Sequence, residues 1–155
     1  MIKELLHQAI ALLARREHSS KELQQKLLRR GYLLDDIKEV LQFVQEKNYQ
    51  SDIRAADCIF RNRLSRGYGW QYIESEMVQK GVTFEIIDSI RQAAEIDWQH
   101  QAMLVYSKKY GDDKIVDQKE KAKRIRFLQY RGFSLDEIMS VVNSNSVNKY
   151  GCEHD

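Results

Sequence analysis

Apolar residues in this chain recur at helical intervals, and no window alternates apolar and polar residues as a half-buried strand would. The pattern therefore predicts an all-α protein. The first helix is expected over residues 2–16. A capping box at Ser19 starts a second helix that ends at Gly31, and a third helix covers residues 35–46. These three helices would form one unit.

Two further units follow the same plan. In the second unit, one helix face is expected to carry Ile53, Ala56, Phe60 and Leu64. Start and stop signals of the same kinds bound the remaining helices: Asp52, Gly67, Gly69, Gly81, Thr83, Asp97, Gly111, Asp117, Gly132 and Ser134. No periodicity remains from Asn143 onward, which predicts a frayed tail.

A basic residue followed by glycine ends the second helix of each unit. The three glycines are Gly31, Gly81 and Gly132, at intervals of 81 − 31 = 50 and 132 − 81 = 51 residues. Apolar residues also match in five registers counted from these glycines: Leu27, Met77 and Leu128; Tyr32, Val82 and Phe133; Leu34, Phe84 and Leu135; Ile37, Ile87 and Ile138; Val40, Ile90 and Val141. Amphipathic helices of unrelated origin would share part of this spacing. Five coincident registers favour a true repeat.

The repeat defines the expected organisation of the chain. We expect three tandem three-helix repeats over residues 1–48, 49–96 and 97–143, forming an elongated, curved array, and a tail over residues 144–155. Such an array suits a long partner better than a small substrate.

Composition narrows the class of protein. The 155 residues include no proline and seven glycines, which permits long helices. Lysine and arginine number 25 and aspartate and glutamate 23, so a surface for an acidic partner must come from local segregation of charge. No apolar stretch is long enough to span a membrane and no signal peptide is present, so a cytoplasmic protein is expected. Cys58 and Cys152 do not form a disulfide framework.

No catalytic constellation is evident, so no enzyme activity, metal or cofactor is expected. The histidines are scattered, and the possible ligands between Cys152 and Asp155 fit a terminal tail better than a metal site. The turn Gly67-Tyr68-Gly69 has no preceding strand and lacks the ending of a phosphate-binding loop.

The helix that begins near Lys119 is the first candidate for a binding surface. Lys119, Lys123, Arg126 and Tyr130 fall within a sector of about 60° on a helical wheel. Like charges placed together repel one another unless an anion lies opposite. Lys108-Lys109 would extend the patch, although an ordinary solvated face explains the same spacing.

The second candidate surface combines arginines with aromatic residues, as strand-stacking surfaces and protein hot spots do. Its members are Arg61, Arg63, Arg66, Tyr68 and Trp70. In the alternative interpretation, Tyr68 and Trp70 fill the joint between helices.

Three segments of the chain resemble the RecX family, the regulatory proteins of the RecA recombinase. Residues 11–27 resemble the family's opening pattern, with Ser19-x-x-Glu22-Leu23-x-x-Lys26-Leu27. Residues 66–77 resemble its Lys/Arg-Gly-Tyr-Gly pattern, and residues 123–138 resemble its closing pattern. The chain departs from the family at Trp70, where a proline is frequent, and at Gln50-Ser51-Asp52, where Leu-Asp-Asp is frequent.

The resemblance implies three three-helix repeats in a cytoplasmic monomer without enzyme activity. It further implies binding to RecA–single-stranded DNA filaments along the helical groove, and loss of filament growth together with RecA's ATPase, strand-exchange and co-protease functions. The residues predicted to face RecA or DNA are Lys108, Lys109, Lys119, Lys123, Arg124, Arg126 and Arg131, followed by Arg61, Arg63, Arg66 and Trp70.

Two alternatives belong to other functional classes. A helical-repeat protein could read duplex DNA directly, as a helix-turn-helix regulator of transcription or of the chromosome does. The third helix of each repeat offers few side chains for base readout: Gln42, Gln45, Arg91, Gln92 and Asn143. An enzyme of unknown class has less support, because no site is visible.

Overall fold

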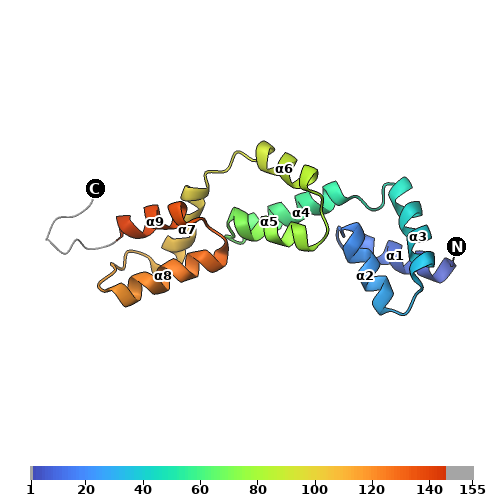
Figure 1. Ribbon diagram of the computed structural model, residues 1–155, viewed down its shortest axis with the longest axis horizontal. Coiled ribbons are helices and arrows are strands. Elements are labelled where there is room, and N and C mark those ends of the chain that lie inside the picture. The colour runs from blue at the N-terminus through green and yellow to red at the C-terminus, as the bar shows by residue number, and fades with distance from the viewer. Residues whose placement is uncertain (1, 146–155) are drawn as a thin grey trace. The chain divides into compact units, whose positions relative to one another are not determined.

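The computed structural model describes residues 2–145, and this part of the chain contains nine α-helices and no sheet (Figure 1). Their bounds are α1 Lys3–Arg15, α2 Ser20–Arg29, α3 Leu34–Glu46, α4 Asp52–Ser65, α5 Trp70–Gln79, α6 Phe84–Ala93, α7 Trp98–Tyr110, α8 Gln118–Arg131 and α9 Leu135–Ser144. The all-α prediction and the three sets of three helices are confirmed. The predicted tail, residues 144–155, lies outside the described residues except for Ser144, which is the last residue of α9, and Asn145, which caps that helix.

Contacts between residues divide the chain into two compact units. The first unit holds the residues up to Arg61 together with Glu76–Ala93, and the second holds Asn62–Ser75 together with the residues from Ala94 on. The division runs through α4 and α5, so it does not follow the predicted repeat boundaries, which stay a prediction.

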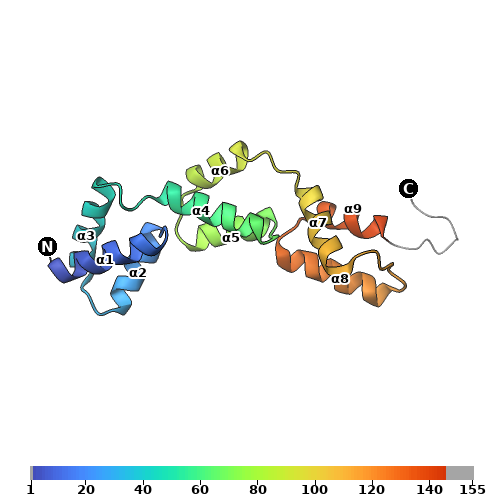
Figure 2. The same cartoon turned by 180° about the vertical axis from the view of Figure 1, so that it is seen from behind.

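The core of the first unit forms where α1, α2 and α3 pack together, as both views show (Figures 1 and 2). Its buried side chains are Leu5, Ala9, Leu12, Leu23, Leu27, Ile37, Val40, Leu41 and Val44. A capping box fixes the start of α2, because the Ser19 hydroxyl accepts from the Glu22 N–H and the Glu22 carboxylate accepts from the Ser19 N–H.

The core of the second unit repeats this arrangement with α7, α8 and α9. Its buried side chains are Ala102, Tyr106, Ile115, Leu128, Phe133, Ile138, Val141 and Val142. Asp117 caps α8 by accepting from the Glu120 N–H, and Ser134 forms a capping box with Glu137. The three starts predicted at Ser19, Asp117 and Ser134 are therefore confirmed.

One hydrogen-bonded joint occurs in both units at matching positions. In the first unit, the Ser19 hydroxyl before α2 donates to the Lys80 carbonyl at 2.6 Å. In the second, the Gly69 N–H before α5 donates to the Arg131 carbonyl at 2.7 Å. The donors differ by 69 − 19 = 50 positions and the acceptors by 131 − 80 = 51, which are the predicted repeat intervals.

Gly132 permits the close approach at the second joint. Its φ is +96°, and an added Cβ would lie 2.5 Å from the Tyr72 N and Cβ atoms. The Gly132 carbonyl also accepts from the Gln71 N–H at 3.0 Å. Both the backbone conformation and the spacing therefore require glycine here.

Burial follows the predicted registers, with two corrections. Leu27, Met77 and Leu128 are fully buried, and so are Ile37 and Ile138. The register of Leu34, Phe84 and Leu135 is exposed in all three repeats, because each is the first residue of its helix. Ile53 was predicted on the apolar stripe of α4 but is 65% exposed, and Ala55 and Ile59 are buried on that helix instead.

No helix among residues 2–145 has both the length and the apolar character needed to cross a membrane.

Candidate functional site

Four cations converge on one groove of the second unit, which we call the basic groove. They are Arg66 in the turn after α4, Lys108 and Lys109 in the last turn of α7, and Arg131 at the end of α8. The apolar part of the lining consists of Leu64, Leu104, Val105 and Phe127. The groove has a volume of about 560 Å³, and none of its lining side chains is acidic.

Close packing of the turn after α4 against α7 forms one wall of the basic groove. The Gln101 amide donates to the Leu64 carbonyl at 2.9 Å. A Cβ added to Gly67 would lie only 2.9 Å from the Val105 side chain, so a bulkier residue would push the turn away from α7. The Gly-Tyr-Gly turn thus helps to position this wall of the groove.

Arg131 connects the second wall to the first. Its guanidinium donates to the Arg66 carbonyl at 2.9 Å, across 65 residues of sequence. The same guanidinium lies 4.9 Å from the Tyr68 ring centre and 5.6 Å from that of Phe127. Lys109 Nζ lies 4.7 Å from the Phe127 ring centre. These cation–π contacts hold Lys109 and Arg131 close together at the groove and so offset the repulsion between their positive charges.

The predicted stripe on α8 is exposed. Lys119, Lys123, Arg126 and Tyr130, which we call the α8 stripe, all lie at the surface, and the Tyr130 side chain is 82% exposed. Leu128 on the other side of the helix is fully buried. The three cations and Tyr130 therefore share one exposed face of α8, as this candidate surface requires.

Arg124 was placed on the partner-facing surface, and this assignment is wrong. It is 3% exposed and lies inside the second unit. Its guanidinium donates to the Glu120 carboxylate at 3.0 Å, the Tyr106 hydroxyl at 2.6 Å and the Asp113 carbonyl at 2.9 Å. It also lies 4.4 Å from the Tyr110 ring centre. Arg124 therefore fastens the α7–α8 connection to the core and does not face solvent.

The surroundings of Arg124 keep it charged. Burial by itself lowers the pKa of this guanidinium, but its hydrogen bonds to Tyr106 and Glu120 outweigh burial, so the pKa is raised above its usual value. Burial has the opposite effect on the neighbouring Tyr110 hydroxyl, whose pKa it raises, although the charge of Arg124 opposes that shift. Arg124 is consequently a buried positive charge whose acceptors are one carboxylate, one hydroxyl and one backbone carbonyl.

Trp70 is also misplaced in the predicted surface, because it is only 6% exposed. Its indole N–H donates to Glu74 at 3.2 Å, and its ring centre lies 6.1 Å from that of Trp98. Tyr68 stacks on Tyr72 at 4.1 Å and is half-buried. The alternative interpretation, in which these aromatic residues fill a joint, describes both side chains better.

The remaining arginines of the second candidate surface have partners of their own. Arg61 is exposed and pairs with Asp57 on the same helix at 2.9 Å. Arg63 is half-buried and lies 5.7 Å from the Tyr68 ring centre. Of this group, only Arg66 lines the basic groove.

Leu104, Gln101 and Phe127 line the basic groove but were not singled out from the sequence. A signal for Leu104 was present, since it precedes Lys108 by four residues and so shares its helix face. No signal linked Gln101 or Phe127 to the turn at Arg66, because those contacts join distant segments.

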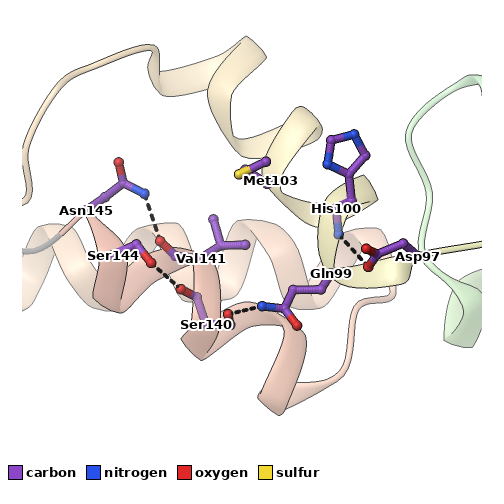
Figure 3. Close-up of a pocket in the computed structure, with 8 residues that line it drawn as sticks. All are labelled: Asp97, Gln99, His100, Met103, Ser140, Val141, Ser144 and Asn145. Atoms are coloured by element: carbon purple, nitrogen blue, oxygen red, sulfur yellow. Dashed lines mark hydrogen bonds between the residues drawn. The ribbon is translucent and has the colours of Figure 1, made fainter. Parts of the chain in front are cut away.

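A second recess of the same unit lies between α7 and α9 (Figure 3). Its polar groups bond to one another or to the backbone of their own helices: Gln99 to Ser140, Asp97 to the His100 N–H, Ser144 to the Ser140 carbonyl and Asn145 to the Val141 carbonyl. The described lining of this recess holds no cluster of like charges, whereas the basic groove gathers four cations, so the basic groove is the better candidate for an acidic partner.

Within residues 2–145, no three His, Cys, Asp or Glu side chains are grouped so as to hold a metal ion. The possible ligands between Cys152 and Asp155 lie outside the described residues.

Comparison of the sequence with known proteins gives matches over most of the chain. Residues 6–43 match the family model of the first three-helix domain of RecX, and residues 95–142 match that of the third. A protein of Vibrio campbellii named Regulatory protein RecX is 42% identical over 130 residues, which cover 84% of each chain. A protein of the same name from Serratia proteamaculans is 35% identical over 162 residues, covering 90% of this chain and 96% of the relative.

Solved structures share the fold. The crystal structure of RecX from Lactobacillus salivarius superposes with a TM-score of 0.70 at 19% identity, and the match covers 90% of this chain and 92% of that one. A second crystal structure, of regulatory protein RecX, also gives a TM-score of 0.70, at 16% identity, and covers 90% of this chain and 70% of that one.

Proposed function

Because this chain belongs to the RecX family, we propose that it regulates the RecA recombinase by binding RecA–single-stranded DNA filaments. Binding would limit filament growth and, with it, RecA's ATPase, strand-exchange and co-protease activities in DNA repair and the SOS response. The protein would act as a cytoplasmic monomer without enzyme activity of its own. The observation that carries the proposal is the 42% identity to a regulatory protein RecX over 84% of the chain.

Two surfaces of the second unit support binding to an acidic partner or to DNA. The α8 stripe places three cations on one exposed helix face, and the basic groove brings four cations from three segments together. A net charge of only +2 means that attraction to a polyanion depends on such local concentration of charge.

Co-sedimentation with preformed RecA filaments tests the proposal. The wild-type protein is expected to sediment with RecA-coated single strands, and less so with the bare strand or with duplex DNA. Binding should weaken as salt rises, because exposed charges are screened beyond a Debye length of about 8 Å at physiological ionic strength. Equal recovery with bare and RecA-coated strands would contradict filament binding.

Direct readout of duplex DNA has less support than filament binding. The Gln42 amide donates to Glu46 at 3.1 Å, and the Gln92 amide donates to Asp88 at 2.8 Å. The Gln45 amide donates to the Ser20 hydroxyl at 3.3 Å. Base readout would have to replace these intramolecular bonds before any base edge could be bound. Preferential binding to duplex DNA in the same sedimentation assay would favour this second function.

A further inference from the structure

The basic groove combines charge with an aliphatic surface, and this combination restricts what it can bind. Its volume of about 560 Å³ suits several side chains of a bound segment. Lys108 and Lys109 lie in the last turn of α7, where the helix dipole alone favours cations. Arg131 in the last turn of α8 and Arg66 directly after α4 are favoured by their own helix ends in the same way, so three helix ends bring their cations to one groove. Four cations with no acidic lining residue indicate an anionic occupant.

The aromatic content of the groove argues against a nucleic-acid strand. Strand-binding surfaces stack bases on open aromatic faces. Among the described residues, Phe127 is the only aromatic one that lines the basic groove. Both Lys109 and Arg131 already lie over its ring, at 4.7 and 5.6 Å from the centre. A base could stack there only after displacing one of these cations.

The aliphatic content of the groove favours a peptide instead. Leu104 is 52% exposed although it is a large apolar side chain, and Val105 beside it is half-buried. Leu64 completes an aliphatic surface to which a leucine or similar side chain would gain hydrophobic contact area. Carboxylates on either side of that side chain would meet Lys108 and Arg66.

We propose that the basic groove binds an acidic peptide segment that inserts an aliphatic side chain against Leu104 and Val105 while its carboxylates pair with Lys108, Lys109 and Arg66. Arg131 acts as a positioning residue, because its guanidinium is bound to the Arg66 carbonyl and holds the two walls together. The identity of the occupant rests on the function proposed above, in that the segment would belong to the regulated filament. Binding of such a peptide can nevertheless be measured without RecA.

Fluorescence anisotropy of the full-length protein tests this directly. The probe is a short fluorescein-labelled peptide of glutamate and aspartate with two central leucines, compared with the same peptide carrying serines instead and with labelled oligothymidylate. Lys108→Glu and Leu104→Ser should each weaken binding of the leucine peptide about tenfold. The serine peptide should bind the wild-type protein about as weakly as the leucine peptide binds Leu104→Ser.

Matched controls lie outside the basic groove. Met103 is the neighbour of Leu104 on α7 and is 45% exposed, but it lines the recess between α7 and α9. Met103→Ser should therefore keep the leucine peptide's affinity within about twofold. Lys114→Glu, an equal change of charge at an exposed site of the same unit that does not line the basic groove, should do the same. Circular dichroism of each variant verifies that the helices remain.

Three outcomes would overturn the proposal: no binding of the leucine peptide, equal loss in groove and control variants, or tight oligothymidylate binding that depends on Lys108 but not on Leu104. The last result would make the groove a nucleic-acid site. RecA co-sedimentation separates the two proposals. If the peptide fails to bind while the wild-type protein still sediments with filaments, only the groove assignment is lost, whereas peptide binding without co-sedimentation refutes the function.

Discussion

Arg124 shows how a charged side chain can belong to the core. Its three hydrogen bonds go to Glu120, the Tyr106 hydroxyl and the Asp113 carbonyl, and Tyr110 lies against its guanidinium. Burying a charge is costly unless it is paired and fully hydrogen-bonded, and here most of the donors have acceptors. Its removal leaves these acceptors without a donor.

We expect Arg124→Ala to lower the free energy of unfolding by about 2–4 kcal/mol, because Tyr106 and the Asp113 carbonyl lose their donor and a cavity remains. Arg126→Ala, two residues along the same helix but exposed, should change stability by less than about 0.5 kcal/mol. Urea unfolding followed by circular dichroism measures both. Equal stability of the two variants would show that the buried cluster contributes nothing.

His18 is the second buried polar residue with a defined role. It is 1% exposed, its Nδ1 lies 3.0 Å from the Arg16 carbonyl, and its Nε2 lies 2.8 Å from Lys26 Nζ. A carbonyl can only accept and an ammonium can only donate, so the ring is neutral with its proton on Nδ1. Burial lowers the pKa of His18, and Arg16 and Lys26 lower it further, while the Arg16 carbonyl bond and Glu22 oppose this.

Stability should therefore fall in acid. Above the unfolded-state pKa of about 6.5, His18 is neutral in both states and its contribution is fully present. As the pH falls below that value toward the lower folded-state pKa, the unfolded chain takes up a proton that the folded chain refuses, and stability is lost. We expect His18→Gln to show a smaller drop in urea midpoint between pH 7.5 and 5 than the wild type. His7→Gln, at an exposed site, should keep the wild-type drop.

At the scale of helices, one hydrogen bond recurs at the repeat interval. In each case the residue before one helix donates to a carbonyl at the end of a later helix. The Ser19 hydroxyl has two partners, since it accepts from the Glu22 N–H and donates to the Lys80 carbonyl. Ser134 forms the same capping box with Glu137, and no bond from its hydroxyl to another helix is seen among the described residues. Comparing the two serines therefore distinguishes the stability contributed by the helix cap from that contributed by the bond to Lys80.

We expect Ser134→Ala to cost about 1 kcal/mol, the usual loss of a helix cap. Ser19→Ala should cost about 1 kcal/mol more, because the Lys80 carbonyl also loses its donor. Urea unfolding of the two variants gives the difference directly. If Ser19→Ala and Ser134→Ala lost the same stability, the joint would contribute nothing at this position.

Sequence patterns predicted the helices well because their signals are local. Capping boxes and basic residue–glycine stops act within four residues, and Ser19, Asp117 and Ser134 begin helices as expected. The error at Arg124 was avoidable, because Leu128 four residues later is fully buried and lies only about 40° away on the helix. The basic groove was not predictable from spacing, since Arg66 and Arg131 meet across 65 residues.

At the scale of the whole molecule, the candidate surfaces are concentrated in one compact unit. The α8 stripe and the basic groove both belong to the second unit, while the chain as a whole carries a net charge of only +2. A partner that is attracted by charge should therefore respond strongly to changes in the second unit and weakly to equal changes in the first.

The most direct test of the account is the inhibition of single-stranded-DNA-dependent ATP hydrolysis by RecA, titrated with the wild type and with two charge-reversed variants. Lys123→Glu/Arg126→Glu alters the α8 stripe, and Lys3→Glu/Lys38→Glu makes the same change in net charge at exposed sites of the first unit. We expect the α8 variant to need about tenfold more protein for half-inhibition, a loss of about 1.4 kcal/mol, with helicity unchanged and the control close to wild type. A wild-type protein that leaves hydrolysis unaffected, or an α8 variant that inhibits as well as the wild type, would contradict the account.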